Sequence, residues 1–143
     1  MSIRLRGLAA SGAATALLTT GLLATGATAA HAATPVCTKT KLITKGAYYA
    51  ELPVSAGGST TCQMGPGNTS SAVKQLQFVL TVCHGLGAGG SDGIYGNGTR
   101  ADVRTVQRAA GINADGLYGP NTRNIIKWRW YGTSNETPKC AKL

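Results

Sequence analysis

The chain is poor in the side chains that most hydrolases use for catalysis. Its 143 residues include only two histidines and five acidic residues. Beyond residue 32 the one histidine is His84, which is too few for the ligand set of a zinc hydrolase. The nucleophile motifs G-x-S-x-G and S-x-x-K do not occur, and the neighbours Cys83 and His84 point in different directions on a predicted helix. We therefore expect no enzyme activity, no bound metal and no cofactor.

Acidic side chains are also scarce relative to basic ones. The 14 Lys and Arg residues give the chain a formal net charge of +9 at pH 7. Such a charge favours anionic partners. The basic residues are dispersed and no groove-reading motif accompanies them, so we do not expect nucleic acid to be a partner.

Long apolar runs are absent except near the amino terminus. Two arginines there precede an uncharged stretch rich in Ala and Leu, residues 7–29, which ends near the A-x-A site Ala30-His31-Ala32. This arrangement is typical of a secretory signal peptide. We predict a signal peptide over residues 1–32, a secreted mature chain and no contact with the membrane after cleavage. An earlier cleavage site after Ala29 and a retained membrane anchor are the alternatives.

The four cysteines all follow the predicted cleavage site and indicate two disulfides, as is usual for an even number in a short exported chain. Three pairings are open. We favour Cys37 with Cys62, which bracket a segment of turn signals without helical period, and Cys83 with Cys140. A zinc site built from the four thiolates is the rival interpretation, and no C-x-x-C spacing supports it.

A nine-residue motif occurs twice in the second half of the chain. The first copy, residues 92–100, reads D-G-I-Y-G-N-G-T-R, and the second, residues 115–123, reads D-G-L-Y-G-P-N-T-R. Each copy indicates an Asp-capped turn that leads into the first turn of a helix. We therefore interpret Asp92 and Asp115 as turn caps rather than as a catalytic carboxylate pair.

Apolar residues at helical spacing predict three helices. The first spans residues 72–83, with Ser70 or Ser71 as its N-cap. The second spans about residues 97–110, and the third starts near Pro120. The residues expected to close a helical bundle are Ile125, Ile126 and one of Trp128 and Trp130.

The segment from Val73 to Trp128 resembles the peptidoglycan-binding domain type 1 family of bacterial cell-wall proteins. It carries the family's V-x-x-L-Q-x-x-L pattern at the first helix and then two D-G-x-Y-G-x-x-T elements. The matching residues outside these two elements are Val73, Leu76, Gln77, Leu80, Val103, Val106 and Gln107. Because that family is a compact three-helix module, the resemblance implies a mainly α fold.

The resemblance and the rest of the sequence together predict four parts. They are a signal peptide (1–32), a disulfide-stapled strand and loop extension (33–67), a three-helix bundle (68–131) and a coiled tail (132–143). The family is non-catalytic, so the resemblance implies a secreted protein that binds peptidoglycan, through stem peptide or glycan, with another anionic wall polymer as a further candidate partner. The alternatives are a secreted structural or inhibitor-like protein that binds another extracellular protein, such as a wall hydrolase, and a remnant targeting module.

We expect the ligand site at the repeated turns. Each turn leads into a helix N-terminus, which exposes unpaired N–H groups and favours an anion. The predicted ligand-binding residues are Tyr95, Asn97, Arg100, Tyr118, Asn121 and Arg123. An arginine would hold a stem-peptide carboxylate while a tyrosine covers its methyl groups, and Pro120 favours the second repeat. Gln77 and Gln107 are expected to pack and to form structural hydrogen bonds.

Overall fold

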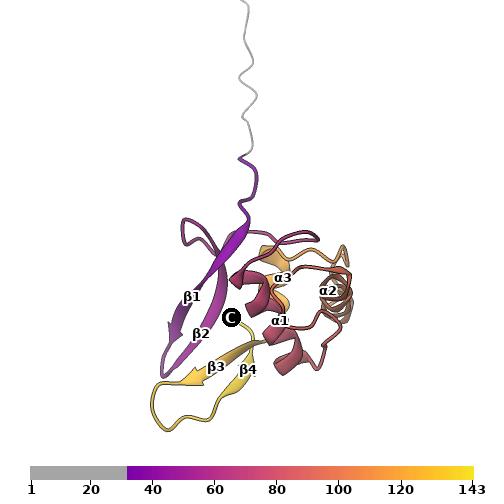
Figure 1. The fold of residues 1–143 in the computed structure, drawn as a ribbon. Coiled ribbons are helices and arrows are strands. Elements are labelled where there is room, and N and C mark those ends of the chain that lie inside the picture. Colours follow the sequence, from indigo (N-terminus) through magenta and orange to yellow (C-terminus); the bar gives the residue numbers. More distant parts are fainter. Residues whose placement is uncertain (1–31) are drawn as a thin grey trace, which may run out of the picture. The chain divides into compact units, whose positions relative to one another are not determined.

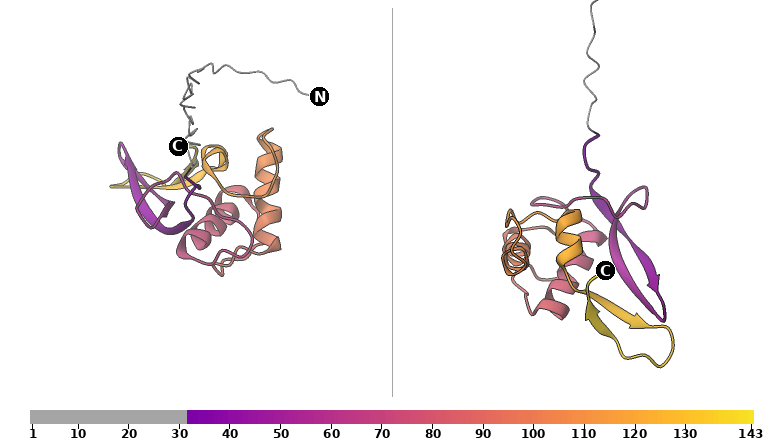
Figure 2. Two further views of the ribbon diagram at one scale, coloured as in Figure 1. Left: turned by 90° about the horizontal axis from the view of Figure 1, so that it is seen from above. Right: turned by 180° about the vertical axis from the view of Figure 1, so that it is seen from behind.

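A computed structural model describes residues 32–143, so the predicted signal peptide, apart from Ala32, lies outside the described residues. The elements are β1 (Cys37–Lys45), β2 (Tyr48–Ser55), α1 (Ser71–His84), α2 (Asn97–Ala109), α3 (Pro120–Ile125), β3 (Trp128–Gly132) and β4 (Lys139–Ala141). The strands form one antiparallel sheet in the order β1-β2-β3-β4. Helix α1 lies between this sheet and α2 (Figures 1 and 2). No helix of residues 32–143 combines the length and apolar character that crossing a bilayer requires.

The prediction of a mainly α three-helix bundle is wrong. The structure adds a four-stranded sheet to which both ends of the described chain contribute. Strand β2 pairs with β3 from Tyr48 opposite Gly132 to Ala50 opposite Trp130. The tail predicted as coil contains β4, and Trp128 and Trp130 lie in β3 instead of closing a bundle.

The residues of β3 explain why it is a strand. Trp128 and Trp130 are buried, whereas Arg129 and Tyr131 between and after them are partly exposed, which is the two-residue period of a strand. Aromatic residues also favour extended backbone. Five residues are too few to show that period clearly in the sequence, and the partner strand precedes all three helices. For this reason the sequence led to the prediction that one of the two tryptophans closes the helical bundle.

The three helices begin where their capping residues predicted them. Ser70 is the N-cap of α1, and its Oγ accepts a hydrogen bond from the backbone N–H of Val73 at 3.2 Å. Gly85 ends α1 with φ of +66°, a left-handed conformation that favours glycine. Helix α3 starts at Pro120 but has only six residues.

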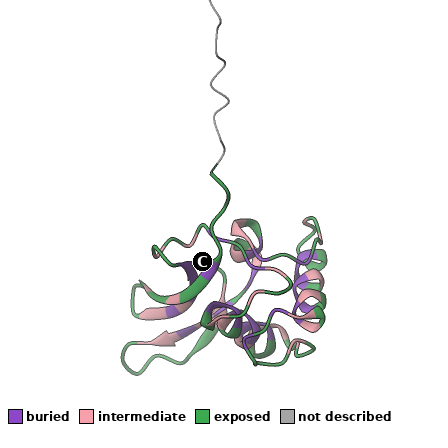
Figure 3. Cartoon of the chain, turned by 45° about the horizontal axis from the view of Figure 1, so that its top comes forward, coloured by how far each residue is buried: buried purple, intermediate pink, exposed green. Residues whose placement is uncertain are grey.

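The predicted disulfides and their pairing are confirmed. Cys37 is bonded to Cys62 within the extension, and Cys83 at the end of α1 is bonded to Cys140 in β4. The buried core joins the sheet to the helices through Leu52, Leu76, Leu80, Ile126 and Trp128. Most of β1, by contrast, is exposed (Figure 3).

Candidate functional site

Gln77 of α1 organises the first repeated turn. Its Oε1 accepts the backbone N–H of Gly93 at 2.8 Å. Its Nε2 lies 2.9 Å from Asp92 Oδ1, 3.0 Å from the carbonyl oxygen of Ile94 and 3.0 Å from Thr99 Oγ1. Gln77 is almost fully buried, so these contacts satisfy an amide that would otherwise be costly to bury. The structural role predicted for this glutamine is confirmed.

Gln107 of α2 repeats this arrangement at the second turn. Its Oε1 accepts the backbone N–H of Gly116 at 2.9 Å. Its Nε2 lies 2.9 Å from Asp115 Oδ1, 3.0 Å from the carbonyl oxygen of Leu117 and 2.9 Å from Thr122 Oγ1. The two repeats are thus equivalent in their hydrogen bonds as well as in their sequence.

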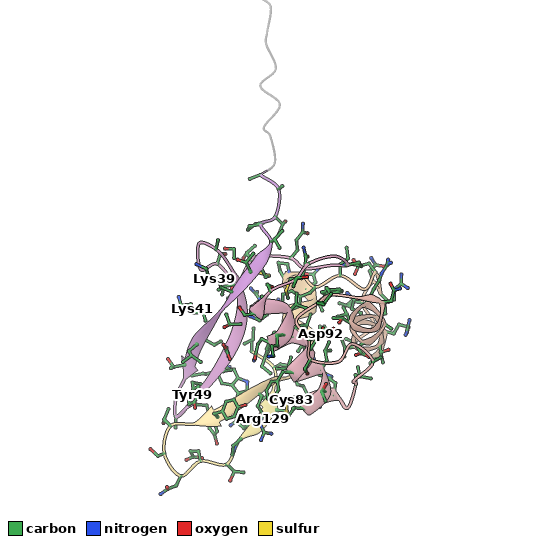
Figure 4. The ribbon with its side chains drawn as sticks, in the orientation of Figure 1. Lys39, Lys41, Tyr49, Cys83, Asp92 and Arg129 are labelled. Carbon is green, nitrogen blue, oxygen red and sulfur yellow. A yellow bond between two sulfur atoms is a disulfide. The ribbon has the colours of Figure 1, made fainter. Side chains whose placement is uncertain are left out.

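The two aspartates cap their turns, as the sequence predicted. Asp92 Oδ1 accepts the backbone N–H of Ile94 at 2.9 Å, and Asp115 Oδ1 accepts that of Leu117 at 2.8 Å. The hydrogen bonds from Ile94 and then from Gln77 hold the pKa of Asp92 below its usual value. Figure 4 shows Asp92 among the helices. A carboxyl group held in its ionised form is unsuited to act as a general acid.

Tyr95 and Tyr118 lie in the core. They are 1% and 0% exposed, and burial raises the pKa of both hydroxyls. Tyr95 donates its O–H to the carbonyl oxygen of Gly116 at 2.8 Å, and the ring of Tyr118 meets that of Trp128 edge to face. Contact between these almost fully buried rings and a ligand stays a prediction.

The repeated arginines contact the protein itself. Nε and Nη2 of Arg100 each lie 3.4 Å from the carbonyl oxygen of Asp115, which connects α2 to the second turn. Arg123 Nη1 donates to the carbonyl oxygen of Thr60 at 3.0 Å and to its Oγ1 at 2.8 Å. Arg123 therefore anchors the N-terminal extension to α3. The structure does not bring the two guanidinium groups to a common site.

The first repeat is closed by the glycine-rich connector that precedes it. The carbonyl oxygen of Gly89 lies 2.8 Å from Gln77 Nε2, and the backbone N–H of Gly89 donates to Asp102 Oδ2 at 3.0 Å. The connector lies so close to the start of α2 that a Cβ at Gly98 would collide with the carbonyl oxygen of Ala88. Only glycine fits at position 98 without displacing the connector.

The second repeat is open at the corresponding place. Asn121 stands where the first repeat has Gly98, and its side chain is exposed. Beside the turn is a cavity of about 360 Å³. It is lined by Gln63, Gln107, Ile112, Asn113, Asp115, Leu117, Tyr118, Gly119, Pro120, Asn121 and Thr122.

A second cavity, of about 310 Å³, continues the first. The two share Gln63 and Leu117, and the second extends over the N-terminal extension. Its remaining lining residues are Val36, Met64, Gly65, Pro66 and Asn68. We call the two cavities together the second-repeat furrow. Met64 holds the extension in place, because its backbone exchanges hydrogen bonds of 2.8 and 2.9 Å with that of Tyr118.

Of the six predicted ligand residues, Tyr118 and Asn121 line the furrow, whereas Tyr95, Asn97, Arg100 and Arg123 do not. Sequence reasoning missed Gln63, Ile112 and Asn113. The position of Ile112 and Asn113, just before the second turn, was a usable signal because the connector precedes the first turn in the same way. The position of Gln63 in the furrow could not be predicted from the sequence, because it depends on the pairing of Met64 with the distant residue Tyr118.

The described residues offer no metal centre, since no three His, Cys, Asp or Glu side chains of residues 32–143 gather around one point. His84 accepts the backbone N–H of Lys127 through Nε2 at 3.0 Å. Burial, followed by the nearby charge of Lys127, lowers its pKa below the usual 6.5. This histidine therefore joins α1 to the start of β3 in its neutral form.

Duplicated glutamine-centred turns, two disulfides and a furrow beside the second turn characterise this small α+β domain. Residues 69–126 match the family described as putative peptidoglycan binding domain. This segment of the chain therefore belongs to that family, which confirms the resemblance seen in the sequence.

Two curated relatives are 43% identical over 61 residues, or 42% of this chain. They are a probable N-acetylmuramoyl-L-alanine amidase of Bacillus licheniformis and a zinc D-Ala-D-Ala carboxypeptidase of Streptomyces albus G. The match spans only 17% and 24% of their lengths. A solved peptidoglycan-binding protein from Clostridioides difficile, in complex with glutamine hydroxamate, is 30% identical with a TM-score of 0.45, over 58% of this chain and 53% of that one.

Proposed function

We propose that this chain is an exported, non-catalytic protein that binds cell-wall peptidoglycan in the second-repeat furrow. One observation carries the proposal. The two repeats share the same internal hydrogen bonds, yet the first is closed by the chain's own connector and the second leaves the equivalent space open. Family membership of residues 69–126 supports peptidoglycan as the ligand.

The furrow lining suits a peptide with small side chains. Its side-chain amides, from Gln63, Asn113 and Asn121, match the donors and acceptors of peptide groups, and Ile112 and Leu117 add apolar surface. Asp115 is its one charged side chain. The lining therefore favours the stem peptide, with its alanine methyl groups and free amine, and no arginine in it would hold a carboxylate.

Export and the absence of catalysis are parts of the same proposal. The predicted signal peptide and the two disulfides both suit an oxidising compartment outside the cytosol. The matched segment is a minor part of the relatives whose names denote enzymes, which supports a binding role for it. We expect the purified protein to release no soluble fragments from peptidoglycan, with or without added zinc.

The experiment compares two matched variants in sedimentation with isolated sacculi. Leu117 and Ile94 occupy the same position in the two repeats and are 43% and 50% exposed. Leu117→Asp places a charge in the furrow, whereas Ile94→Asp places the same charge beside the closed turn. We expect Leu117→Asp to weaken binding by roughly tenfold or more, because it removes an apolar contact and a bound ligand would have to desolvate the new carboxylate, and we expect Ile94→Asp to bind as the native chain does.

Equal weakening by both variants would show that added negative charge, and not the furrow, is responsible. Native binding by Leu117→Asp would place the ligand elsewhere. If the native protein fails to sediment with sacculi at all, the alternative of a protein partner is favoured. Thermal unfolding of both variants checks that each remains folded.

A further inference from the structure

Lysines gather on one face of the sheet, outside the family segment. Lys39, Lys41 and Lys45 alternate along β1 and are exposed, so their side chains project from the same face of this edge strand. Figure 4 shows Lys39 and Lys41 along β1, which is an edge strand of the sheet. Lys39 and Lys41 are two residues apart, or roughly 7 Å, whereas Lys45 lies four residues beyond Lys41, or roughly 13 Å, with Ile43 between them.

The row leads to a small cavity of about 200 Å³. It is lined by Lys45, Tyr48, Trp130, Lys139, Ala141 and Lys142. The antiparallel register explains this grouping, because Lys45 lies opposite Tyr48 and Trp130 lies opposite Lys139. The lining contains three ammonium groups and no carboxylate.

The neighbouring contacts fix the polarity of this cavity. Lys139 Nζ lies 3.6 Å from the centroid of the Tyr48 ring, which holds one ammonium over the aromatic surface. The Tyr48 hydroxyl donates to Glu136 Oε2 at 2.9 Å, and Trp130 Nε1 donates to the carbonyl oxygen of Ala141 at 3.1 Å. The polar ends of both rings are thus satisfied, and the ammonium groups are the donors left for a ligand.

We propose that this lysine-lined cavity and the lysine row on β1 bind the phosphate groups of a phosphodiester-linked polymer. Three lysines that line one hollow attract an oxyanion more strongly than dispersed lysines do. Because the lysines extend along β1 from the cavity at Lys45 to Lys39, they favour a chain with several phosphates over a single small anion. This site is independent of the second-repeat furrow, with which it shares no residue.

The test measures binding of inorganic polyphosphate at several salt concentrations. The site variant is Lys45→Gln with Lys139→Gln, and the control is Lys74→Gln with Arg108→Gln, which removes the same charge from exposed positions of α1 and α2. We expect the site variant to bind at least several-fold more weakly and to lower the salt slope by about 2, one for each lost phosphate contact. The control is expected to keep the native slope to within about 0.5.

An equal loss in the control would overturn the proposal, because net charge alone would then explain binding. Native binding by the site variant would also overturn it. The proposed polymer is a phosphodiester of the cell wall, so tighter binding of a single-stranded oligodeoxynucleotide than of polyphosphate would overturn the proposal by assigning the site to nucleic acid. Sacculi chemically stripped of phosphodiester polymers separate the two proposals, since the Lys45→Gln, Lys139→Gln protein should bind them normally and Leu117→Asp should not.

Discussion

Glutamine is the residue type on which both repeated turns depend. Each turn offers a glycine N–H that needs an acceptor, and a carbonyl, a carboxylate and a hydroxyl that need a donor. One side-chain amide supplies both, whereas glutamate would repel the aspartate and leucine would leave the glycine N–H without its acceptor and the other three groups without this donor. The same chemistry explains why Gln77 and Gln107 are buried although they are polar.

Replacing Gln107 by leucine should destabilise the chain strongly. The change leaves the Gly116 N–H and the Thr122 hydroxyl without this partner in a buried place, and we expect a loss of roughly 3 kcal/mol in the free energy of unfolding. Gln77→Leu should behave alike. The control is Gln75→Leu, which loses one hydrogen bond to the Glu51 carbonyl at a partly exposed position and should cost about 1 kcal/mol. Urea unfolding measures all three, and similar losses for Gln75 and Gln107 would contradict the argument.

His84 makes the stability of the chain depend on pH. Because its pKa is lowered in the folded state, the unfolded chain takes up a proton at a higher pH than the folded chain does. The stability that neutral His84 contributes to the folded state is therefore fully present above pH 6.5, the pKa of the histidine in the unfolded chain. This stability is lost as the pH falls through the lower pKa of the folded state.

We expect the melting temperature to fall between pH 7.5 and pH 5.5, a window in which ordinary carboxylates do not titrate. His84→Gln, which has no titratable group, should show a smaller fall over the same window. An unchanged fall in this variant would assign the pH dependence to another group.

At the scale of elements, the connector and α2 fit together through one glycine. Gly98→Ala would drive a methyl group into the Ala88 carbonyl, and we expect a loss of about 1 to 3 kcal/mol as the connector or the helix start shifts. Gly96→Ala is the matched control, because its added methyl would meet nothing within 4 Å and its φ of −93° is open to alanine. We expect that control to stay within about 0.5 kcal/mol of the native chain. Comparable losses in chemical denaturation would contradict the fit described for Gly98.

The elements differ in how far the sequence could predict them. The starts of two helices could be predicted from local sequence, because Ser70 is an N-cap and Pro120 occupies a first helical position. Strand β3 could not be predicted in the same way, because its stability comes from pairing with β2 across the whole helical segment. The strand runs of the extension were visible, but the sheet that unites them with β3 and β4 was not.

The residues of the candidate site likewise differ in how far the sequence could predict them. Asn121 and the preference for the second repeat came from the motif itself. The closure of the first repeat by Gly89, and the arrival of Gln63 at the second, depend on contacts between segments that no local pattern encodes. The sequence also could not show that Arg100 and Arg123 contact backbone groups of other segments, and their role as ligand residues stays a prediction.

At the scale of the whole molecule, export and oxidation can be checked in one measurement. Intact-mass analysis of the exported protein should give the mass of residues 33–143 less the four hydrogens lost in two disulfides. Reduction and alkylation should then label four cysteines, and none without reductant. A mass that includes the first 32 residues would contradict the predicted cleavage, and free thiols would contradict the pairing.

The sheet draws its inner strands from segments near the two ends of the described residues, and this separation determines when folding can be completed. Residues 48–50 find their partners only at residues 130–132, and Cys83 finds its own only at residue 140. Contacts between such distant segments form slowly. If the chain crosses a membrane in an unfolded state, it cannot complete this sheet until β4 has crossed. Strand β4 is the last strand in the order of the chain, so the sheet cannot form early and block transport.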